Sequence, residues 1–180
     1  MTERLVRVLE LPVPVEVLWA FHERPDAFAL LQPPWEASEV IALPKSLEVG
    51  ARAVLGAKLG PLTLRIEAEH VAYEQGRSFT DTMLRGPFRS WVHEHLCEPT
   101  ATGSRLVDTV DYELPFGALG KLFGGAMVRR RLDRLFTYRH EVTLRECLAA
   151  VAEGRPRRGG RASEGPELGG RPRTRAQTFA

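Results

Sequence analysis

Apolar and polar residues change their spacing twice along this chain, and each change marks a different kind of structure. Leu5 to Leu11 is apolar on both faces and ends at Pro12, which predicts a first strand. From Val15 apolar residues follow a helical spacing through Leu18, Trp19 and Phe21 or His22, and this helix is expected to end near Pro25. A second, short helix is expected from Ala27 to Leu31, because Pro33-Pro34 prevents it from continuing.

A run of six strands is predicted after these helices. Short, turn-rich segments separate the strands, which is typical of antiparallel strands that follow one another in a sheet. From Leu62 to His70 every second residue is apolar or a histidine, and the residues between them are polar. One face of the sheet should therefore be covered and the other exposed to water. The predicted strands are Trp35–Ala42, Ala51–Leu59, Leu62–Glu74, Arg77–Arg85, Arg89–Glu98 and Arg105–Leu114.

Helical spacing returns at about Ala118 and continues to about Ala152. A helix of this length would be roughly 50 Å long, enough to lie diagonally across a whole sheet. Gly124-Gly125 lowers the helical propensity near its start. This glycine pair fits close packing, a frayed first turn, or a mobile lid beside the mouth of a pocket.

The composition is that of one domain with a real core, followed by a tail. The chain has 180 residues, of which 43% are hydrophobic. Residues 1–152 are predicted to form the domain, and residues 153–180 a disordered tail rich in Arg, Gly and Pro. The tail holds seven arginines against three acidic residues, a net charge of +4, so the other 152 residues carry a net charge of −2. The domain therefore lacks a basic nucleic-acid-binding surface, whereas weak contact of the tail with nucleic acid or an anionic surface stays open.

The cysteines and the N-terminal sequence indicate in which compartment the protein is expected. Cys97 and Cys147 are too few and too far apart for a disulfide framework or a metal-binding motif. Met1 to Leu5 leads into the first strand without the apolar core of a signal peptide. No apolar run approaches the length needed to span a bilayer. We therefore expect a soluble, cytoplasmic protein without membrane insertion.

Ionisable residues recur on one face of the predicted sheet, where hairpin geometry brings them together. Side chains alternate between faces along a strand, so His93 and His95 point the same way. The turn at Gln75-Gly76 would place His70 opposite Asp81. The next tight turn would place Asp81 opposite His93. The expected result is a row of three ionisable residues on neighbouring strands.

The same alignment extends this row into a candidate binding wall. A loop from Pro99 to Gly103 would place His95 near Asp108. Bulky apolar and aromatic residues share this face of the strands. Polar groups set among such residues are typical of the wall of a ligand pocket. The candidate ligand-binding residues are His70, Phe79, Asp81, Met83, Trp91, His93, His95, Asp108 and Tyr112.

The ionisable residues admit several interpretations. They can form an internal hydrogen-bond network that fixes strand register, because buried ionisable groups are tolerated when paired. They can form a polar anchor in an apolar cavity, where an imidazole binds the head group of a ligand. In a catalytic interpretation, His93 or His95 is a general base, and Asp81 or Asp108 fixes the tautomer of that histidine. Two histidines and one carboxylate can also bind a metal ion, but no further metal signature accompanies them.

The other two histidines are expected elsewhere. His22 should be a helix cap or a surface group, and His140 should make a structural contact between the last helix and the sheet. The sequence contains neither a glycine-rich phosphate loop nor a Gly-x-Ser-x-Gly elbow. No cofactor and no metal ion are therefore expected.

Short motifs within about residues 3–150 carry a resemblance to a known superfamily. They are Phe21-His22-Glu23-Arg24-Pro25, Pro33-Pro34-Trp35-Glu36, Gly86-Pro87-Phe88, Trp91-Val92-His93-Glu94-His95, Asp111-Tyr112-Glu113-Leu114-Pro115-Phe116-Gly117 and Phe136-Thr137-Tyr138-Arg139-His140. Together with the predicted order of elements, they resemble the SRPBCC or START-like (helix-grip) superfamily. This superfamily includes birch-pollen-allergen-like ligand carriers and polyketide cyclases/dehydrases. The motifs look like one bacterial branch, whose members sometimes occur fused to a sugar-nucleotide-epimerase-like domain.

The resemblance implies both a fold and a function. The implied fold is an α+β helix-grip fold, in which a seven-stranded antiparallel sheet wraps around a long C-terminal helix and two short helices follow the first strand. An internal hydrophobic cavity between sheet and helix is implied as well. We therefore expect the protein to bind a small hydrophobic molecule that is lipid-, polyketide- or aromatic-like. The alternatives are a cyclase or dehydratase with a histidine base, and an interaction module that works with an epimerase-like partner.

Overall fold

The centre of the protein is one seven-stranded antiparallel sheet. The structure, a computed structural model, describes residues 2–36, 38–59, 62–115 and 117–154. Strands follow one another in the sheet from β2 to β7, and β1 closes the far edge beside β7, giving the order β1-β7-β6-β5-β4-β3-β2. The strands are β1 (Glu3–Leu11), β2 (Ser38–Ala42), β3 (Arg52–Leu59), β4 (Leu62–Glu74), β5 (Ser78–Arg85), β6 (Ser90–Thr100) and β7 (Gly103–Glu113).

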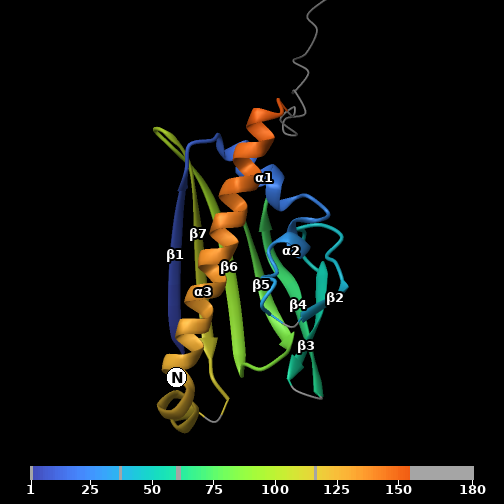
Figure 1. Cartoon of the computed structure of the whole chain (residues 1–180), viewed down its shortest axis with the longest axis vertical. Helices are drawn as coiled ribbons and strands as arrows, with labels where there is room; N and C mark the ends of the chain where they lie inside the picture. The colour runs from blue at the N-terminus through green and yellow to red at the C-terminus, as the bar shows by residue number, and fades with distance from the viewer. Residues whose placement is uncertain (1, 37, 60–61, 116, 155–180) are drawn as a thin grey trace, which may run out of the picture.

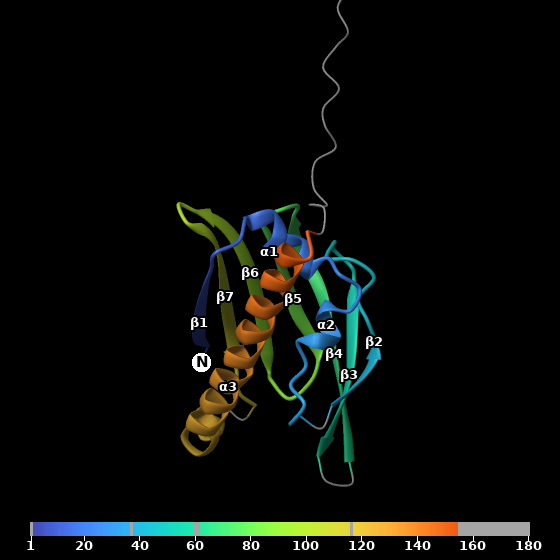
Figure 2. The same cartoon turned by 45° about the horizontal axis from the view of Figure 1, so that its top comes forward.

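Three helices lie on one side of this sheet (Figure 1). Helices α1 (Val15–His22) and α2 (Ala27–Leu30) follow β1, and α3 (Gly117–Ala152) follows β7. Figures 1 and 2 show α3 crossing the sheet diagonally on the side of β1 and β7, with α1 beside its C-terminal half. The predicted α+β helix-grip fold is confirmed.

Two further expectations concern membrane insertion and the C-terminal tail. Within the described residues, no helix is long and apolar enough to cross a membrane. The tail predicted from residue 153 falls outside the described residues from position 155 onward.

Helix α3 is fixed to the sheet through two clusters of buried apolar side chains. In the first cluster, which surrounds α1, it buries Val142 and Cys147. In the second cluster, beside β1 and β7, it buries Leu132 and Phe136. Full burial of a large apolar side chain contributes about 1.5–3 kcal/mol. These anchors therefore hold the helix over one half of the sheet and leave room beside the other half.

The segment before β2 departs from the prediction, because it forms a turn rather than a strand. The N–H of Glu36 donates to the carbonyl of Pro33 at 3.1 Å, so the strand expected from Trp35 begins only at Ser38. The side chain of Trp35 is 42% exposed. Its ring packs at 5.1 Å from the ring of Tyr138 on α3. The turn thus directs this tryptophan toward the helix instead of into the sheet.

A bulge in β4 changes the register that hairpin geometry predicts. The turn pairs Glu74 with Ser78, not with Arg77 as the assumed two-residue turn required. The register shifts by one between His70 and Ala72, which leaves Val71 as an extra residue. Beyond the bulge the predicted pairing of His70 with Asp81 is restored. The other pairings predicted for this face, Asp81 with His93 and His95 with Asp108, are both present.

Candidate functional site

A cavity of about 850 Å³ lies between the sheet, α3 and the α1–α2 segment. Alternate residues of β3 to β6 form its floor, because the strands present every second side chain to this face. Exposed side chains, among them Lys45, Lys58 and Arg131, belong to its lining, so the cavity opens to solvent. Much of the wall is apolar and includes Phe28, Leu55, Leu64, Ile66, Val128 and Leu135. Its volume and lining are those of a site for a small molecule.

The structure places seven of the nine predicted ligand-binding residues in this wall. They are His70, Phe79, Asp81, Met83, Trp91, His93 and His95. Among the described residues, the lining does not include the other two, Asp108 and Tyr112. Tyr112 is buried in the second core cluster, where its hydroxyl donates to the Glu3 carboxylate at 3.2 Å. Asp108 lies behind the histidines and organises them.

The carboxylate of Asp108 gathers imidazoles from β6 and α3. Its Oδ1 lies 3.0 Å from His93 Nε2, which donates to it, and 2.9 Å from His95 Nδ1. The second contact is short but poorly aligned as a hydrogen bond. Its Oδ2 accepts from His140 Nε2 at 2.8 Å, so the predicted contact between His140 and the sheet is present. Burial acts to raise the pKa of Asp108, but hydrogen bonds from these imidazoles outweigh it and hold the pKa well below its usual range.

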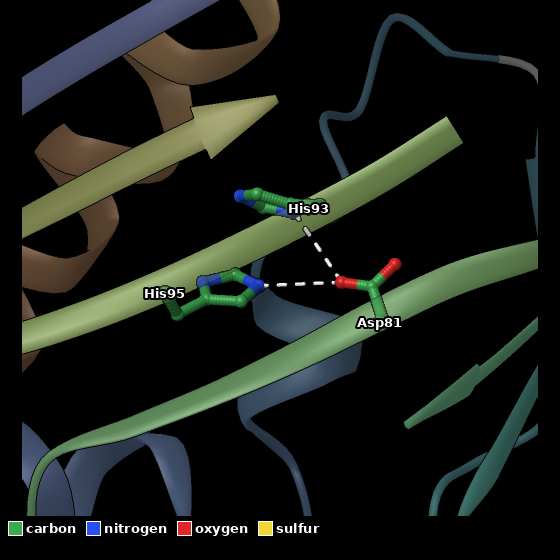
Figure 3. A group of neighbouring side chains, drawn as sticks. All are labelled: Asp81, His93 and His95. Carbon is green, nitrogen blue, oxygen red and sulfur yellow. Dashed lines mark ion pairs between the residues drawn. The ribbon is translucent and has the colours of Figure 1, made fainter. Parts of the chain in front are cut away.

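Asp81 faces the same two histidines from the cavity side. Its Oδ2 lies 3.4 Å from His93 Nδ1 and 3.4 Å from His95 Nε2 (Figure 3). Burial again opposes ionisation, and the two imidazoles lower the pKa of Asp81 below its ordinary value. Burial acts to lower the pKa of His93 as well, but its contacts with Asp108 and Asp81 raise it above the ordinary value. The result is a compact acid–imidazole cluster at one wall of an apolar cavity.

His70 stands apart from this cluster although it pairs with Asp81 in the sheet. Its ring packs against Phe79, with ring centroids 5.4 Å apart. Its Nδ1 is buried and has no hydrogen-bond partner among the described residues. Burial lowers the pKa of His70, which favours a neutral ring. The predicted row is therefore divided: the His70 ring lines the cavity, but its Nδ1 is enclosed by protein and takes no part in the acid–imidazole cluster.

His22 was expected as a cap or surface group, and this prediction is wrong. The side chain is only 7% exposed and lies in the cavity wall. Its Nδ1–H donates to the carbonyl of Leu18 at 2.9 Å, and its ring lies 5.8 Å from that of Phe79. Burial, helped by repulsion from His95, lowers the pKa of His22 to about 4. The helix turns this residue inward because Leu18 and His22 share one face at the spacing of four.

Arg139 is a cavity residue that sequence reasoning missed. Its Nε donates to the carbonyl of Leu31 at 3.3 Å, and its guanidinium lies over the ring of Phe136, 5.6 Å from the centroid. Burial lowers its pKa. The available signal was its position three residues after Phe136, which places both side chains on the inner face of α3.

The glycine pair near the start of α3 also borders the cavity. Gly124 belongs to the lining, and a Cβ added there would meet no described atom within 4 Å. Close packing therefore does not explain the glycine at this position.

The chain matches one protein family over most of its length. The family described as polyketide cyclase/dehydrase and lipid transport matches residues 11–136. The chain therefore belongs to this family, and the resemblance seen in its motifs is confirmed. Among curated proteins, none matches the sequence. Family membership supports a ligand-binding or cyclase role in general terms.

Solved structures share the fold at low sequence identity. TTHA0849 from Thermus thermophilus matches with a TM-score of 0.61 and 20% identity, over 83% of this chain and 99% of its own. The Zhui aromatase/cyclase from a Streptomyces species matches with a TM-score of 0.64 and 14% identity, over 84% and 96% of the two chains. A nucleoside-diphosphate sugar epimerase from Corynebacterium glutamicum matches with a TM-score of 0.63 and 25% identity, over 83% of this chain but only 30% of its own.

Proposed function

We propose that the protein binds a small, largely apolar molecule of lipid, polyketide or aromatic type. The observation that carries this proposal is the cavity of about 850 Å³, whose apolar wall includes one acid–imidazole cluster. A molecule that fits there loses contact with water over most of its surface. Each 100 Å² of apolar ligand surface so buried contributes about 2.5 kcal/mol before the costs of association. Hydrophobic burial therefore supplies affinity, and the polar groups supply orientation.

The polar groups suit a ligand with one oxygen-bearing end. His70 and His95 line the cavity, and an imidazole can donate to or accept from a hydroxyl or carbonyl group, depending on its tautomer. Asp81, which is partly accessible from the cavity, can accept from a hydroxyl. Leaving such buried groups unpaired costs about 1–3 kcal/mol each, so a ligand that satisfies them is favoured over a pure hydrocarbon.

The test is a binding measurement on a variant with a filled cavity. Ala68 lies in the floor of the cavity, and Ala68→Trp would occupy part of its volume. Val92, next to His93 on β6, is 42% exposed and points to the other face of the sheet, so Val92→Trp is the matched control. We expect Ala68→Trp to weaken binding of the fluorescent probe 8-anilino-1-naphthalenesulfonate by at least about 10-fold, and Val92→Trp to leave it unchanged. Equal probe binding by both variants would contradict the proposal.

Native mass spectrometry of the full chain, purified from its own host, gives a second test. A co-purifying apolar compound that is absent from Ala68→Trp identifies the ligand class. The carrier proposal fails if the wild-type chain has an apo mass and neither lipids nor polyphenols change its unfolding temperature.

A cyclase or dehydratase is the second candidate function. The observation that favours it is the placement of His93 and His95 between two carboxylates in the cavity wall. Proton transfer near neutral pH is the step that ring closure and dehydration require, and imidazole is suited to it. On this proposal His95→Ala abolishes turnover of a poly-β-keto substrate while probe binding survives. Turnover that persists in His95→Ala and in His93→Ala would exclude a histidine base.

An epimerase-like protein is the proposed partner. The support is the Corynebacterium glutamicum epimerase, in which the matching region is 30% of the chain. The proposal is tested by mixing the purified chain with a separately encoded epimerase-like protein of the same organism and measuring their co-elution. Separate elution at micromolar concentrations would exclude a stable pair.

A further inference from the structure

Three donor atoms in the cavity wall converge on one point. They are Oδ2 of Asp81 on β5, and Nδ1 of His93 and Nε2 of His95 on β6. All three residues offer donor atoms that lie within 4.8 Å of one another. Figure 3 shows the carboxylate and both imidazole rings turned toward each other from two adjacent strands. Because the residues belong to paired strands, the sheet holds these donors in place.

The distances from the carboxylate oxygen to the two imidazole nitrogens fit a tetrahedral metal ion. Zinc binds imidazole nitrogen and carboxylate oxygen at about 2.0–2.2 Å. At a tetrahedral angle such bonds place neighbouring donor atoms about 3.3–3.5 Å apart. Asp81 Oδ2 lies 3.4 Å from His93 Nδ1 and 3.4 Å from His95 Nε2. Both distances fall in this range. His93 Nδ1 and His95 Nε2 lie within 4.8 Å of each other, and a bound tetrahedral ion would hold these two nitrogens about 3.3–3.5 Å apart as well.

Asp108 provides the outer carboxylate that metal-binding histidines usually have. It contacts the far nitrogen of each ring: Nε2 of His93 at 3.0 Å and Nδ1 of His95 at 2.9 Å. A hydrogen on each of these nitrogens is stabilised by the carboxylate, which leaves the lone pairs of His93 Nδ1 and His95 Nε2 facing Asp81. One carboxylate thus orients both ligands, in the way that outer-shell carboxylates orient zinc-bound histidines.

This arrangement needs a positive charge between the rings and Asp81. Two imidazole lone pairs that face a carboxylate oxygen at 3.4 Å repel it unless a cation lies between them. Either protons on the two rings or one divalent metal ion can supply that charge. A divalent ion also balances the charges of the two carboxylates, Asp81 and Asp108.

We propose that Asp81, His93 and His95 bind one divalent transition metal ion, of the size and ligand preference of zinc. Three protein ligands leave the fourth tetrahedral position open, as in catalytic rather than structural zinc sites. Because all three residues line the cavity, this position faces the cavity. A water molecule or the oxygen-bearing end of a ligand would complete the coordination. Metal binding does not require the apolar ligand, so this site and the carrier function can fail separately.

Cobalt titration of the untagged, chelator-treated full chain is the test. Tetrahedral Co²⁺ with nitrogen and oxygen ligands gives intense visible absorption bands, and thiolate charge-transfer bands would instead reveal binding by Cys97 or Cys147. We expect one Co²⁺ per chain without thiolate bands, and displacement of the bands by Zn²⁺. We also expect one Zn²⁺ per chain after dialysis, and a higher unfolding temperature in its presence.

Three variants separate the proposed site from adventitious binding. Asp81→Asn and His95→Ala each remove one ligand and should weaken Co²⁺ binding by at least about 100-fold, whereas loss of an outer-shell group costs about 10–100-fold. The control is Glu94→Gln, which removes a carboxylate from the same strand, between the two histidines but on the exposed face. It should bind Co²⁺ like the wild type. Circular dichroism of each variant checks that the fold is retained.

Two results would overturn the metal site. One is a folded wild-type chain that takes up no stoichiometric Co²⁺ or Zn²⁺, in which case protons alone occupy the space between the rings and Asp81. The other is a folded Asp81→Asn variant that binds Co²⁺ as tightly as Glu94→Gln. Probe binding by the metal-free protein, measured in parallel, decides the carrier function independently.

Discussion

Asp108 is the residue on which the cluster depends, because one carboxylate contacts three imidazoles. Its side chain is 5% exposed, and its partners come from β6 and from α3. It thereby ties the long helix to the sheet through a polar contact inside an otherwise apolar layer. Burying a charge without partners is costly, so the three contacts are also what allows a carboxylate to occupy this position.

Asp108→Asn should therefore lower the free energy of unfolding by about 3 kcal/mol, because it leaves buried imidazoles without their charged partner. The matched control is Asp111→Asn on the same strand. Asp111 pairs with Arg4 in a contact where both side chains are partly exposed, so its loss should cost less than about 1 kcal/mol. Urea unfolding near pH 7 measures both. Equal losses in the two variants would show that the buried cluster does not stabilise the fold.

His22 predicts a dependence of stability on pH. Its pKa is about 4 in the folded protein and about 6.5 as the ordinary value. As the pH falls from 6.5 to 4, the unfolded chain takes up a proton that the folded chain does not, so folding becomes less favourable. This contribution is absent above pH 6.5 and reaches about 3 kcal/mol near pH 4.

The comparison of wild type with His22→Gln isolates this contribution. Glutamine does not titrate, and its amide can still donate to a backbone carbonyl. The unfolding free energy of the variant should fall less between about pH 7 and pH 4 than that of the wild type, by about 3 kcal/mol. Parallel pH profiles would show that His22 is not buried as a neutral ring.

Helices and strands could be predicted where the spacing of apolar residues within the segment itself determines them. β4 begins and ends where the alternation of apolar and polar residues predicts. The two histidines of β6 share a face for the same reason. His22 and Arg139 could not be placed in this way, because their burial depends on how α1 and α3 dock on the sheet. The way a helix docks on the sheet depends on the packing of all the elements together. The spacing of apolar residues within one helix therefore does not predict it.

The bulge at Val71 could not be predicted from the alternation of apolar and polar residues either. An unbroken alternation through β4 puts Ala72 opposite Phe79 on the inner face, with Tyr73 facing outward. The bulge instead pairs Tyr73 with Phe79 and brings the Tyr73 ring to 5.9 Å from that of Trp19. The turn shifts the pairing by one residue from the predicted register, and the bulge shifts it back by one. The predicted pairing of His70 with Asp81 is therefore correct although the turn and the strand between them were predicted wrongly.

Tyr73→Ala tests this register. If Tyr73 packs inside, the substitution should cost about 2 kcal/mol, less than a fully buried aromatic because the ring is partly exposed. Val71→Ala, at the extra residue of the bulge, should change stability by less than about 0.5 kcal/mol, because its side chain is 45% exposed. Chemical denaturation of both variants gives the comparison. A larger loss in Val71→Ala would favour the unbroken register.

At the scale of the whole molecule, the cavity exists because α3 packs on only one half of the sheet. The two core clusters hold the helix over β1 and β7, and the floor of β3 to β6 is left to the α1–α2 segment and to a ligand. The apolar surface that this floor exposes to the cavity is not buried by the fold itself. A ligand that covers it adds to the stability of the folded state, since the unfolded chain has no such site.

Ligand binding should therefore raise the stability of the whole chain by an amount set by its concentration. A ligand present at about 100 times its dissociation constant should add about 2.7 kcal/mol to the free energy of unfolding. Urea unfolding with increasing 8-anilino-1-naphthalenesulfonate measures this increase in the wild type and in Val92→Trp. In Ala68→Trp the increase should be lost, because the indole occupies the space that the probe needs. Stabilisation that is equal in all three proteins would mean that the probe binds outside the cavity, and the apolar floor would then need another explanation.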